Sequence, residues 1–308
     1  MEIVSQGLQS IIDGLLTGGV YAMIGVGLSL IFGVMKVINF GHGEFVILGM
    51  YSAFFAFSAL GIDPFVSILF IAPLAYGLGF LIHRLVLSKL LGANQQSTQL
   101  ATLGTGLIIS NLLLLKFGAQ PQSFYNESSS NTWSVHLGTL ELRITIIRFV
   151  AVLLTAVLIF ALNYVLYRTE LGRAIRATAQ NRLGAELQGV DTRKIYAVVF
   201  GTGVTLAVAA GVLLLPILST ATLTMNTTFT NKAFIVTVLG GLGSIPGAIL
   251  GGLILGVVES LGSSILPLIP ALGNHFGSNY RDAYGLLIFL LVLLFKPEGL
   301  FGRTVKRV

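Results

Sequence analysis

Three polar side chains lie within six residues in the stretch INFGHGEF, which separates two long apolar runs. They are the amide of Asn39, the imidazole of His42 and the carboxylate of Glu44, all groups that form hydrogen bonds or carry charge. Two of them have a simple structural interpretation: Asn39 caps a helix, and Glu44 lies beside the positive end of the helix dipole. That interpretation does not explain His42, which stands between two glycines. An ionisable residue beside or within a membrane is a functional hypothesis by default.

The composition around these residues is that of an integral membrane protein. The 308 residues are 55% hydrophobic and 10% charged, with a mean hydropathy of +0.90, whereas soluble domains carry roughly 25% charged residues. The apolar segments are rich in Leu, Gly, Ala and Ile and lack the short alternating pattern of an outer-membrane barrel. The sequence therefore predicts an all-α polytopic membrane protein in a bacterial-type inner (plasma) membrane. About eight hydrophobic segments are expected, at 14–35, 45–60, 64–82, 98–115, 144–166, 195–218, 233–258 and 283–295.

Basic residues predict the orientation of these segments. Most of the 18 Lys and Arg residues lie in 83–97, in 168–194 and in the tail from 296. The positive-inside rule places these three segments on the cytoplasmic side and the polar loop 117–143 outside. With one crossing each at 233–258 and 283–295, however, the basic tail would lie outside.

An interruption near residue 245 resolves that conflict. Gly243, Ser244 and Pro246 break a long apolar stretch, and proline disfavours helix at the residue before it. We therefore expect a re-entrant hairpin of two half-helices over 233–262, which returns the tail to the inside. Interrupted helices in the two halves of a transporter point to its conduit, so we expect 38–44 and 240–247 to line a path together.

Glycine spacing predicts where helices pack closely. Gly14 and Gly18, Gly243, Gly247 and Gly251, and Gly252 and Gly256 repeat the small-xxx-small register that lets membrane helices touch. Close packing is our interpretation for most of the 37 glycines.

A short helix is expected inside the basic segment 168–194. Asn181 is a plausible N-cap and Gly189 a plausible C-terminal stop, with Leu183 and Leu187 on one face between them. The segment 173–191 is either a docking element for a cytoplasmic partner or a basic helix held to anionic lipid.

Several stretches resemble the permease subunits of branched-chain amino-acid (Liv-type) ABC importers. YAMIGVGLSLIFGVMKVINFGHGEF is similar to the family's signature region, with Gly41 where alanine is expected. VTVLGGLGSIPGAILGGLILG and LVLLFKPEGLFG resemble its C-terminal motifs, and GRAIRATAQNRLGAELQGVDT resembles its cytoplasmic loop. The resemblance covers nearly the whole chain in the same order, so a single permease domain over 1–308 is expected.

The resemblance implies partners that the chain depends on. The phosphate-binding pattern GxxxxGK[ST] is absent, so ATP and Mg are expected to be used by two cytoplasmic ABC ATPase subunits and no cofactor is expected on this chain. A second related permease subunit, in a homo- or heterodimer, and an extracytoplasmic substrate-binding protein complete the expected importer, and no nucleic acid is expected. The resemblance also favours a coupling role for the cytoplasmic segment, carried by Arg173, Arg176, Asn181, Leu183, Glu186 and Leu187.

Other functions remain as alternatives. The same type of importer could carry urea, amides, other amino acids or aromatic acids. An ion-coupled secondary carrier would need ion or proton sites in several spans, which are sparse here. A membrane enzyme is disfavoured because the four histidines are scattered, there are no cysteines, and no metal-site spacing occurs. Glu259 either faces the conduit or caps or pairs locally near a helix end, and Lys232 either attracts a carboxylate or snorkels. The adjacent Arg281 and Asp282 are expected to point apart as interface anchors.

Overall fold

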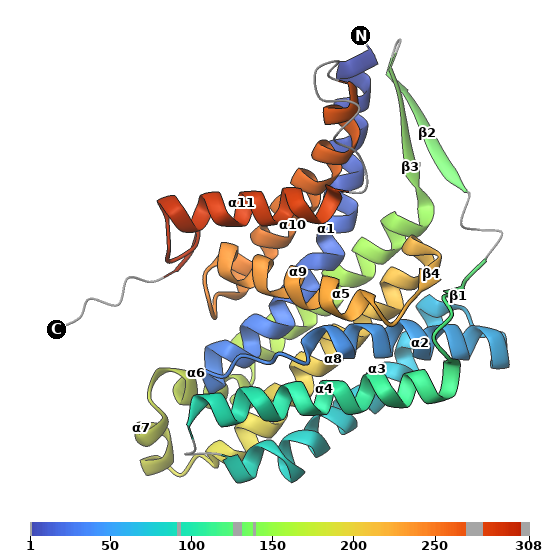
Figure 1. The fold of residues 1–308 in the computed structure, drawn as a ribbon. Helices are drawn as coiled ribbons and strands as arrows, with labels where there is room; N and C mark the ends of the chain where they lie inside the picture. The colour runs from blue at the N-terminus through green and yellow to red at the C-terminus, as the bar shows by residue number, and fades with distance from the viewer. Residues whose placement is uncertain (1, 91–93, 126–130, 138–139, 269–279, 303–308) are drawn as a thin grey trace.

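The protein is a bundle of long helices with a β-hairpin at one end (Figure 1). The computed structural model describes residues 2–90, 94–125, 131–137, 140–268 and 280–302. In chain order the elements are α1 (Glu2–Met35), α2 (His42–Leu60), α3 (Pro64–Leu85), the 3-10 helix η1 (Leu87–Leu90), α4 (Gln95–Phe117), β1 (Gln122–Ser123), β2 (Thr132–Leu137), β3 (Leu140–Thr145), α5 (Ile146–Arg168), α6 (Glu170–Gln180), α7 (Arg182–Leu187), α8 (Thr192–Leu218), β4 (Thr220–Ala221), α9 (Met225–Gly240), α10 (Ile245–Ile265), the 3-10 helix η3 (Leu266–Leu268) and α11 (Arg281–Phe295).

The predicted all-α membrane fold is confirmed. Within the described residues, seven helices are long and apolar enough to cross a bilayer: α1 to α5, α8 and α10. The predicted segment 233–258 divides between α9 and α10, and the predicted segment 283–295 is α11, which has only 15 residues. The predicted count of about eight therefore corresponds to seven full-length helices plus the shorter α9 and α11.

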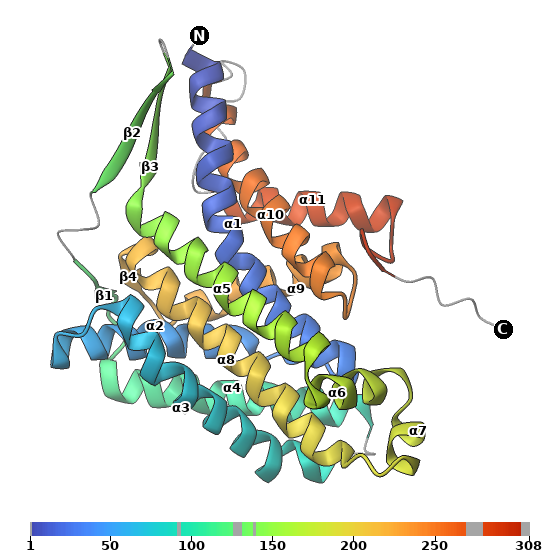
Figure 2. The ribbon, with the colours of Figure 1, turned by 180° about the vertical axis from the view of Figure 1, so that it is seen from behind.

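The centre of the bundle is formed by α1 and α8. In each of these helices, 83% of the most apolar window is buried inside the chain, against 22–28% in α3, α4 and α5. α1 and α10 lie side by side in both views (Figures 1 and 2). The predicted small-residue registers form this contact, since a Cβ on Gly14 would lie 2.6 Å from Val257 Cα and one on Gly18 would lie 2.7 Å from the Gly252 carbonyl oxygen.

The two ends of the bundle carry different structures. The end of the bundle that carries α6 and α7 also contains the end of α3 and the start of α4 (Figure 2). At the opposite end, β2 and β3 pair as an antiparallel hairpin from Thr132–Thr145 to Leu137–Leu140, and β1 pairs with β4. β1, β2 and most of β3 fall in the predicted outer loop 117–143, whereas β4 follows α8, and none of these strands was anticipated. Residues 126–130 and 138–139 of that loop lie outside the described residues.

The chain after α11 returns to the end that carries α6 and α7. The backbone N–H groups of Leu300 and Phe301 donate to the carbonyls of Leu239 and Gly240 at the end of α9. The adjacent Gly243 packs on Gly33, near the last turn of α1. α9, α10 and α11 thus run in alternating directions. The chain after α11 therefore returns to the same end as the α9–α10 turn, which is the outcome that the predicted hairpin was introduced to explain. The basic tail beyond residue 302 lies outside the described residues.

Candidate functional site

The chain between α1 and α2 runs back into the bundle. α1 ends at Met35, after which Lys36 adopts a left-handed conformation with φ of 56° and its backbone N–H donates to the Phe32 carbonyl at 2.9 Å. Residues 36–41 form no helix, and α2 begins only at His42. The positive φ at Lys36 ends α1 and redirects the chain, so the five residues that follow, 37–41, can return along α1.

His42 lies level with the middle of α1. Its ring Nε2 is 3.0 Å from the carbonyl oxygen of Ile24 and must carry the proton, because a carbonyl only accepts. Ile24 precedes the end of α1 at Met35 by eleven residues, or about 16 Å of helix. That distance is about half of a 30 Å hydrocarbon core. α2 therefore begins beside the middle of α1 and not beside its end.

Asn39 stabilises the turn that leads into α2. Its Oδ1 accepts from the backbone N–H of Gly41 at 3.1 Å, and the N–H of Phe40 donates to Thr102 Oγ1 of α4 at 3.1 Å. The N-cap position of α2 belongs to Gly41, which has no side chain to bind the helix. The interpretation of Asn39 as the helix cap is therefore wrong, because Asn39 lies two residues too early and caps the preceding turn instead.

Glu44 lies in the first turn of α2, as expected, and contacts two other helices. Its Oε1 accepts from Asn226 Nδ2 of α9 at 3.2 Å, and only 8% of the residue is exposed. A Cβ on Gly106 of α4 would lie 3.0 Å from the Glu44 carboxyl carbon, so that glycine provides the space for the carboxylate. Thr230 of α9 accepts from the backbone N–H of Gly43 at 3.1 Å. The polar start of α9, TMNTTFTNK, was the signal in the sequence for these α9 contacts, which our sequence analysis missed.

The three side chains each keep one buried polar atom without a partner in the described chain. These atoms are Asn39 Nδ2, His42 Nδ1 and Glu44 Oε2. With Nε2 protonated and the ring neutral, Nδ1 accepts a hydrogen bond, while Nδ2 donates and Oε2 accepts. Buried polar atoms are normally satisfied by protein, water or a ligand. The segment therefore offers one donor and two acceptors in the interior of a membrane protein.

The second predicted set lies at the turn between α9 and α10. Ser244 is the N-cap of α10, and its Oγ accepts from the backbone N–H of Gly247 at 3.2 Å. Pro246 lies in the first turn of α10, where a missing N–H is tolerated, and Gly243 has a φ of 82°. A Cβ on Gly33 of α1 would lie 3.2 Å from the Gly243 Cα.

The structure does not bring the two predicted sets together. His42 contacts Ile24 of α1, whereas Gly243 packs on Gly33, nine residues further along and about 13 Å away. The break itself lies where it was expected, at 241–244. The prediction of two half-helices is wrong for the second limb, because α10 has 21 residues and is long enough to span the membrane. Its glycines let it follow α1 closely along its length, which supports a full helix.

The expected short helix in the basic segment is α7. Asn181 is its N-cap, as predicted, and its Oδ1 accepts from the backbone N–H of Gly184 at 2.9 Å. Gly189 follows the helix with a φ of 83°, which agrees with its predicted role as the stop. Leu183 and Leu187 are 66% and 78% exposed. α7 thus presents two leucines outward from a helix that is fixed at both ends.

Glu186 anchors α7 to the start of α8. Its Oε1 accepts from Thr192 Oγ1 at 2.6 Å and lies 2.9 Å from Arg182 Nε. The hydrogen bond from Thr192, followed by that from Arg182, lowers the pKa of the Glu186 carboxyl below its usual value. Glu186 therefore serves the position of α7, while the two leucines form its outward surface.

The two predicted arginines of α6 have different surroundings. Arg173 forms an exposed ion pair with Glu170 at 3.2 Å, which has little energetic weight. The Arg176 guanidinium lies 5.2 Å from the centroid of the Tyr167 ring, and its Nη1 is buried without a hydrogen-bond partner in the described chain. Arg176 therefore packs on α5, whereas Arg173 lies on the exposed surface of α6.

A buried charge network joins α1, α9, α10 and α11. Lys232 of α9 contacts the carboxylate of Glu259 of α10 and lies 2.8 Å from Asp282 of α11. Arg281 Nε lies 3.2 Å from the other oxygen of Glu259, and the Lys232 ammonium lies 4.8 Å from the centroid of the Tyr21 ring in α1. The Glu259 and Lys232 side chains are only 1% and 6% exposed.

This network corrects part of the sequence-based interpretation. Glu259 forms ion pairs, in line with the alternative that it pairs locally, and Lys232 binds the carboxylates of Glu259 and Asp282. Arg281 and Asp282 were expected to point apart as interface anchors. Both side chains instead reach the same network, because α11 begins beside the buried side chains of Lys232 and Glu259. Lys232, Glu259 and the adjacent pair Arg281 and Asp282 come from three segments that lie far apart in the sequence, so no local pattern identifies them as one cluster.

Comparison with known proteins identifies the family of this chain. The family described as branched-chain amino acid transport system, permease component, matches residues 10–296. The chain belongs to this permease family. It is 34% identical to the high-affinity branched-chain amino acid transport system permease protein BraD of Pseudomonas aeruginosa, over 96% of each chain. It is 32% identical to the permease protein LivH of Escherichia coli, again over 96% of each chain.

More distant relatives extend the same picture. The permease is 25% identical to the permease protein LivM of Escherichia coli, over 92% of this chain and 68% of LivM. No solved structure matches it. Together with its apolar helices, the family identifies the chain as a multi-pass inner-membrane permease subunit.

Proposed function

We propose that this permease forms one half of the membrane pathway of an ATP-driven importer for branched-chain or related hydrophobic amino acids. The observation that carries the proposal is the similarity to BraD and LivH over 96% of the chain, since both are named as branched-chain amino acid permeases. A second related permease, two ABC ATPases that use ATP and Mg, and an extracytoplasmic binding protein complete the importer. The chain itself has no catalytic role and binds no cofactor.

Transmission of ATP hydrolysis is assigned to the cytoplasmic segment 173–191. The exposure of Leu183 and Leu187 supports this assignment, because an apolar pair on a short protruding helix suits a groove on a partner. The bond of Glu186 to Thr192 ties α7 to the start of α8, a central helix of the bundle. A displacement of α7 by the ATPase would therefore move α8 directly.

The translocation path is assigned to Asn39, His42 and Glu44, with Gly243, Ser244 and Pro246 nearer the inner side. The unpartnered atoms of the first three support their role, since they suit the polar groups of an amino acid. The second three terminate α9 and start α10, where a change in the turn would alter the inner end of the path. Both sets lie against α1, which gives the two positions a common support.

ATPase activity of the importer reconstituted in lipid nanodiscs tests the function. We expect the binding protein loaded with leucine to stimulate ATP hydrolysis, and the same binding protein loaded with nothing to stimulate it much less. Stimulation only by a binding protein loaded with urea, an amide or an aromatic acid would replace the substrate class while keeping the importer. Purification of the transport-active permease without any ATPase would refute the importer and favour an ion-coupled carrier.

A further inference from the structure

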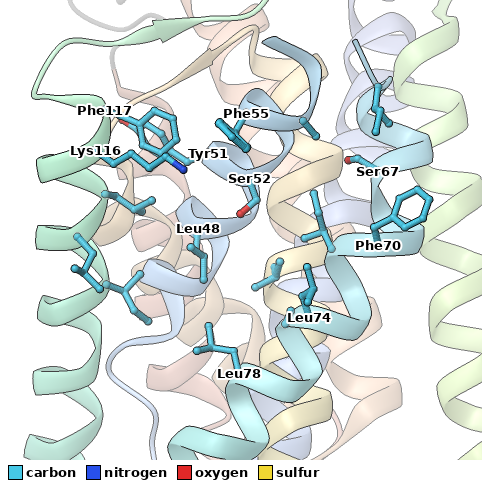
Figure 3. A pocket seen from close by; sticks show the side chains of 18 of the residues that line it. Leu48, Tyr51, Ser52, Phe55, Ser67, Phe70, Leu74, Leu78, Lys116 and Phe117 are labelled. Atoms are coloured by element: carbon cyan, nitrogen blue, oxygen red, sulfur yellow. The ribbon is translucent and has the colours of Figure 1, made fainter. Parts of the chain in front are cut away.

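A long apolar cavity of about 800 Å³ lies between α2, α3 and α4, away from Asn39, His42 and Glu44. Figure 3 shows side chains of the three helices lining it, with Leu48 and Phe55 of α2 and Leu74 and Leu78 of α3 among them. Its size is within the range of pockets that bind small molecules. The cavity is open toward the outside of the bundle, so its occupant comes from the surrounding bilayer.

The cavity has the length of one bilayer leaflet. Along α2 it extends from Leu48 to Leu60, about 18 Å, and along α3 from Ser67 to Leu78, about 16 Å. One leaflet contributes about 15 Å to the hydrocarbon core. The end of α2 and the start of α3 lie at the end of the bundle where β1 pairs with β4 (Figure 2). The cavity therefore follows the outer leaflet from its surface toward the middle of the membrane.

One cation marks the outer end of this cavity. Lys116, in the last turn of α4, is the one charged residue among those lining the cavity, and its ammonium lies 4.0 Å from the centroid of the Phe55 ring. Within the described part of the chain no carboxylate pairs with it. Figure 3 shows its nitrogen directed toward Tyr51 and Phe55, over the cavity. A cation held at the membrane surface above an apolar groove suits a lipid phosphate.

The lining argues against a helix of another protein as the occupant. Membrane helices pack closely through small residues, as α1 and α10 do through their glycines. No glycine lines the cavity, and beside the small Ser52, Ala56, Ser67 and Ala75 its walls carry large, widely exposed side chains, with Phe70 at 61%, Leu74 at 73% and Leu112 at 60%. A flexible acyl chain fits such an irregular surface more easily than a rigid helix does.

We propose that this cavity is a binding site for an anionic phospholipid of the outer leaflet. One acyl chain lies along α2 between α3 and α4, and the phosphate group pairs with Lys116. The bound lipid fills the space between α3 and α4, both of which pack on α2, and thereby supports the part of the bundle that carries Gly41 and Glu44.

Photocrosslinking in the cell membrane tests this site on the protein with its native partners. Phe70 is replaced by p-benzoylphenylalanine, which preserves an aromatic side chain, and the adducts formed on illumination are identified by mass spectrometry. The matched control carries the same amino acid at Phe160 of α5, which is 71% exposed and remote from the cavity. We expect anionic phospholipid among the adducts at position 70 to be enriched about fivefold over the control, as one basic residue near the headgroups predicts.

The contribution of Lys116 is tested in the same background. Lys116→Gln is expected to remove the enrichment, and Lys116→Arg is expected to retain it. Lys89→Gln lies in η1, before the start of α4 and thus at the opposite end of that helix from Lys116; it is the control for a general change of charge and is expected to have no effect. Adducts to a protein chain at position 70 would overturn the proposal in favour of a partner interface. A lipid composition equal to that at Phe160, or unchanged by Lys116→Gln, would also overturn it.

Discussion

Replacing Glu259 by Gln is expected to be among the most destabilising single changes of a polar side chain in this permease. Gln has nearly the same size, so the change removes a charge without opening a cavity. Glu259 faces both Lys232 and Arg281, and its own side chain is 1% exposed. After the substitution, Lys232 remains 6% exposed, and Asp282 is its one acidic partner among the residues that the structure describes.

The expected loss of stability follows from the different burial of the Glu259 and Asp282 side chains. At an effective dielectric constant of about 20, two opposite charges about 3 Å apart attract by about 5 kcal/mol. Part of that attraction offsets the cost of burying the charges, and breaking a buried pair from one side costs about 3–5 kcal/mol. Asp282 is 60% exposed, so Asp282→Asn is expected to cost about 1 kcal/mol or less. Each substitution removes one negative charge beside Lys232. The two carboxylates differ in their burial.

Unfolding in mixed micelles measures both effects. The folded fraction of the purified permease is followed by circular dichroism as a denaturing detergent replaces the mild one, for wild type, Glu259→Gln, Asp282→Asn, Lys232→Met and the double variant Lys232→Met with Glu259→Gln. The double variant is expected to be more stable than Glu259→Gln alone, because it leaves no buried lysine without its carboxylate.

Two results would refute this reasoning. Equal losses for Glu259→Gln and Asp282→Asn would show that burial does not set the strength of the network. A double variant whose loss equals the sum of the two single losses would show that Lys232 and Glu259 do not interact energetically.

Three further changes test other parts of the structure. Leu183→Asp combined with Leu187→Asp is expected to abolish stimulation of the ATPase by the loaded binding protein without lowering the amount of permease in the membrane. The control with Met at both positions is expected to retain stimulation. An ATPase that is still stimulated in the Asp double variant would disprove the coupling role. Gly49→Ala places a Cβ 2.0 Å from a carbonyl oxygen of α8 and is expected to destabilise the permease by about 1–3 kcal/mol in the same unfolding assay, while Gly77→Ala, with open space around it, leaves stability unchanged. Glu44→Gln is expected to lower leucine uptake by cells by about 10- to 100-fold, the value of one hydrogen bond to a charged group, at a normal expression level; unchanged uptake would exclude the Glu44 charge from the path.

Predictions from the sequence were reliable for features that depend on a single short segment, such as the ends of helices. Asn181, Gly189 and Ser244 act at helix ends, because caps and stops depend on the residues beside them. The break at 241–244 follows from the same local chemistry of glycine and proline. The position of α2 was not predictable in this way, since the extended course of residues 36–41 depends on contacts with α4 and α9.

The sequence alone thus determined a helical membrane protein, its family and the two places where its helices are interrupted. Apolar length, the distribution of basic residues and the order of motifs carry that information within single segments. Only the tertiary structure decided the depth of His42, the separation of Gly243 from it, and the union of Lys232, Glu259, Arg281 and Asp282. Each of these depends on which helices pack together and at what height. Contacts between distant segments set that packing, and no local pattern encodes it.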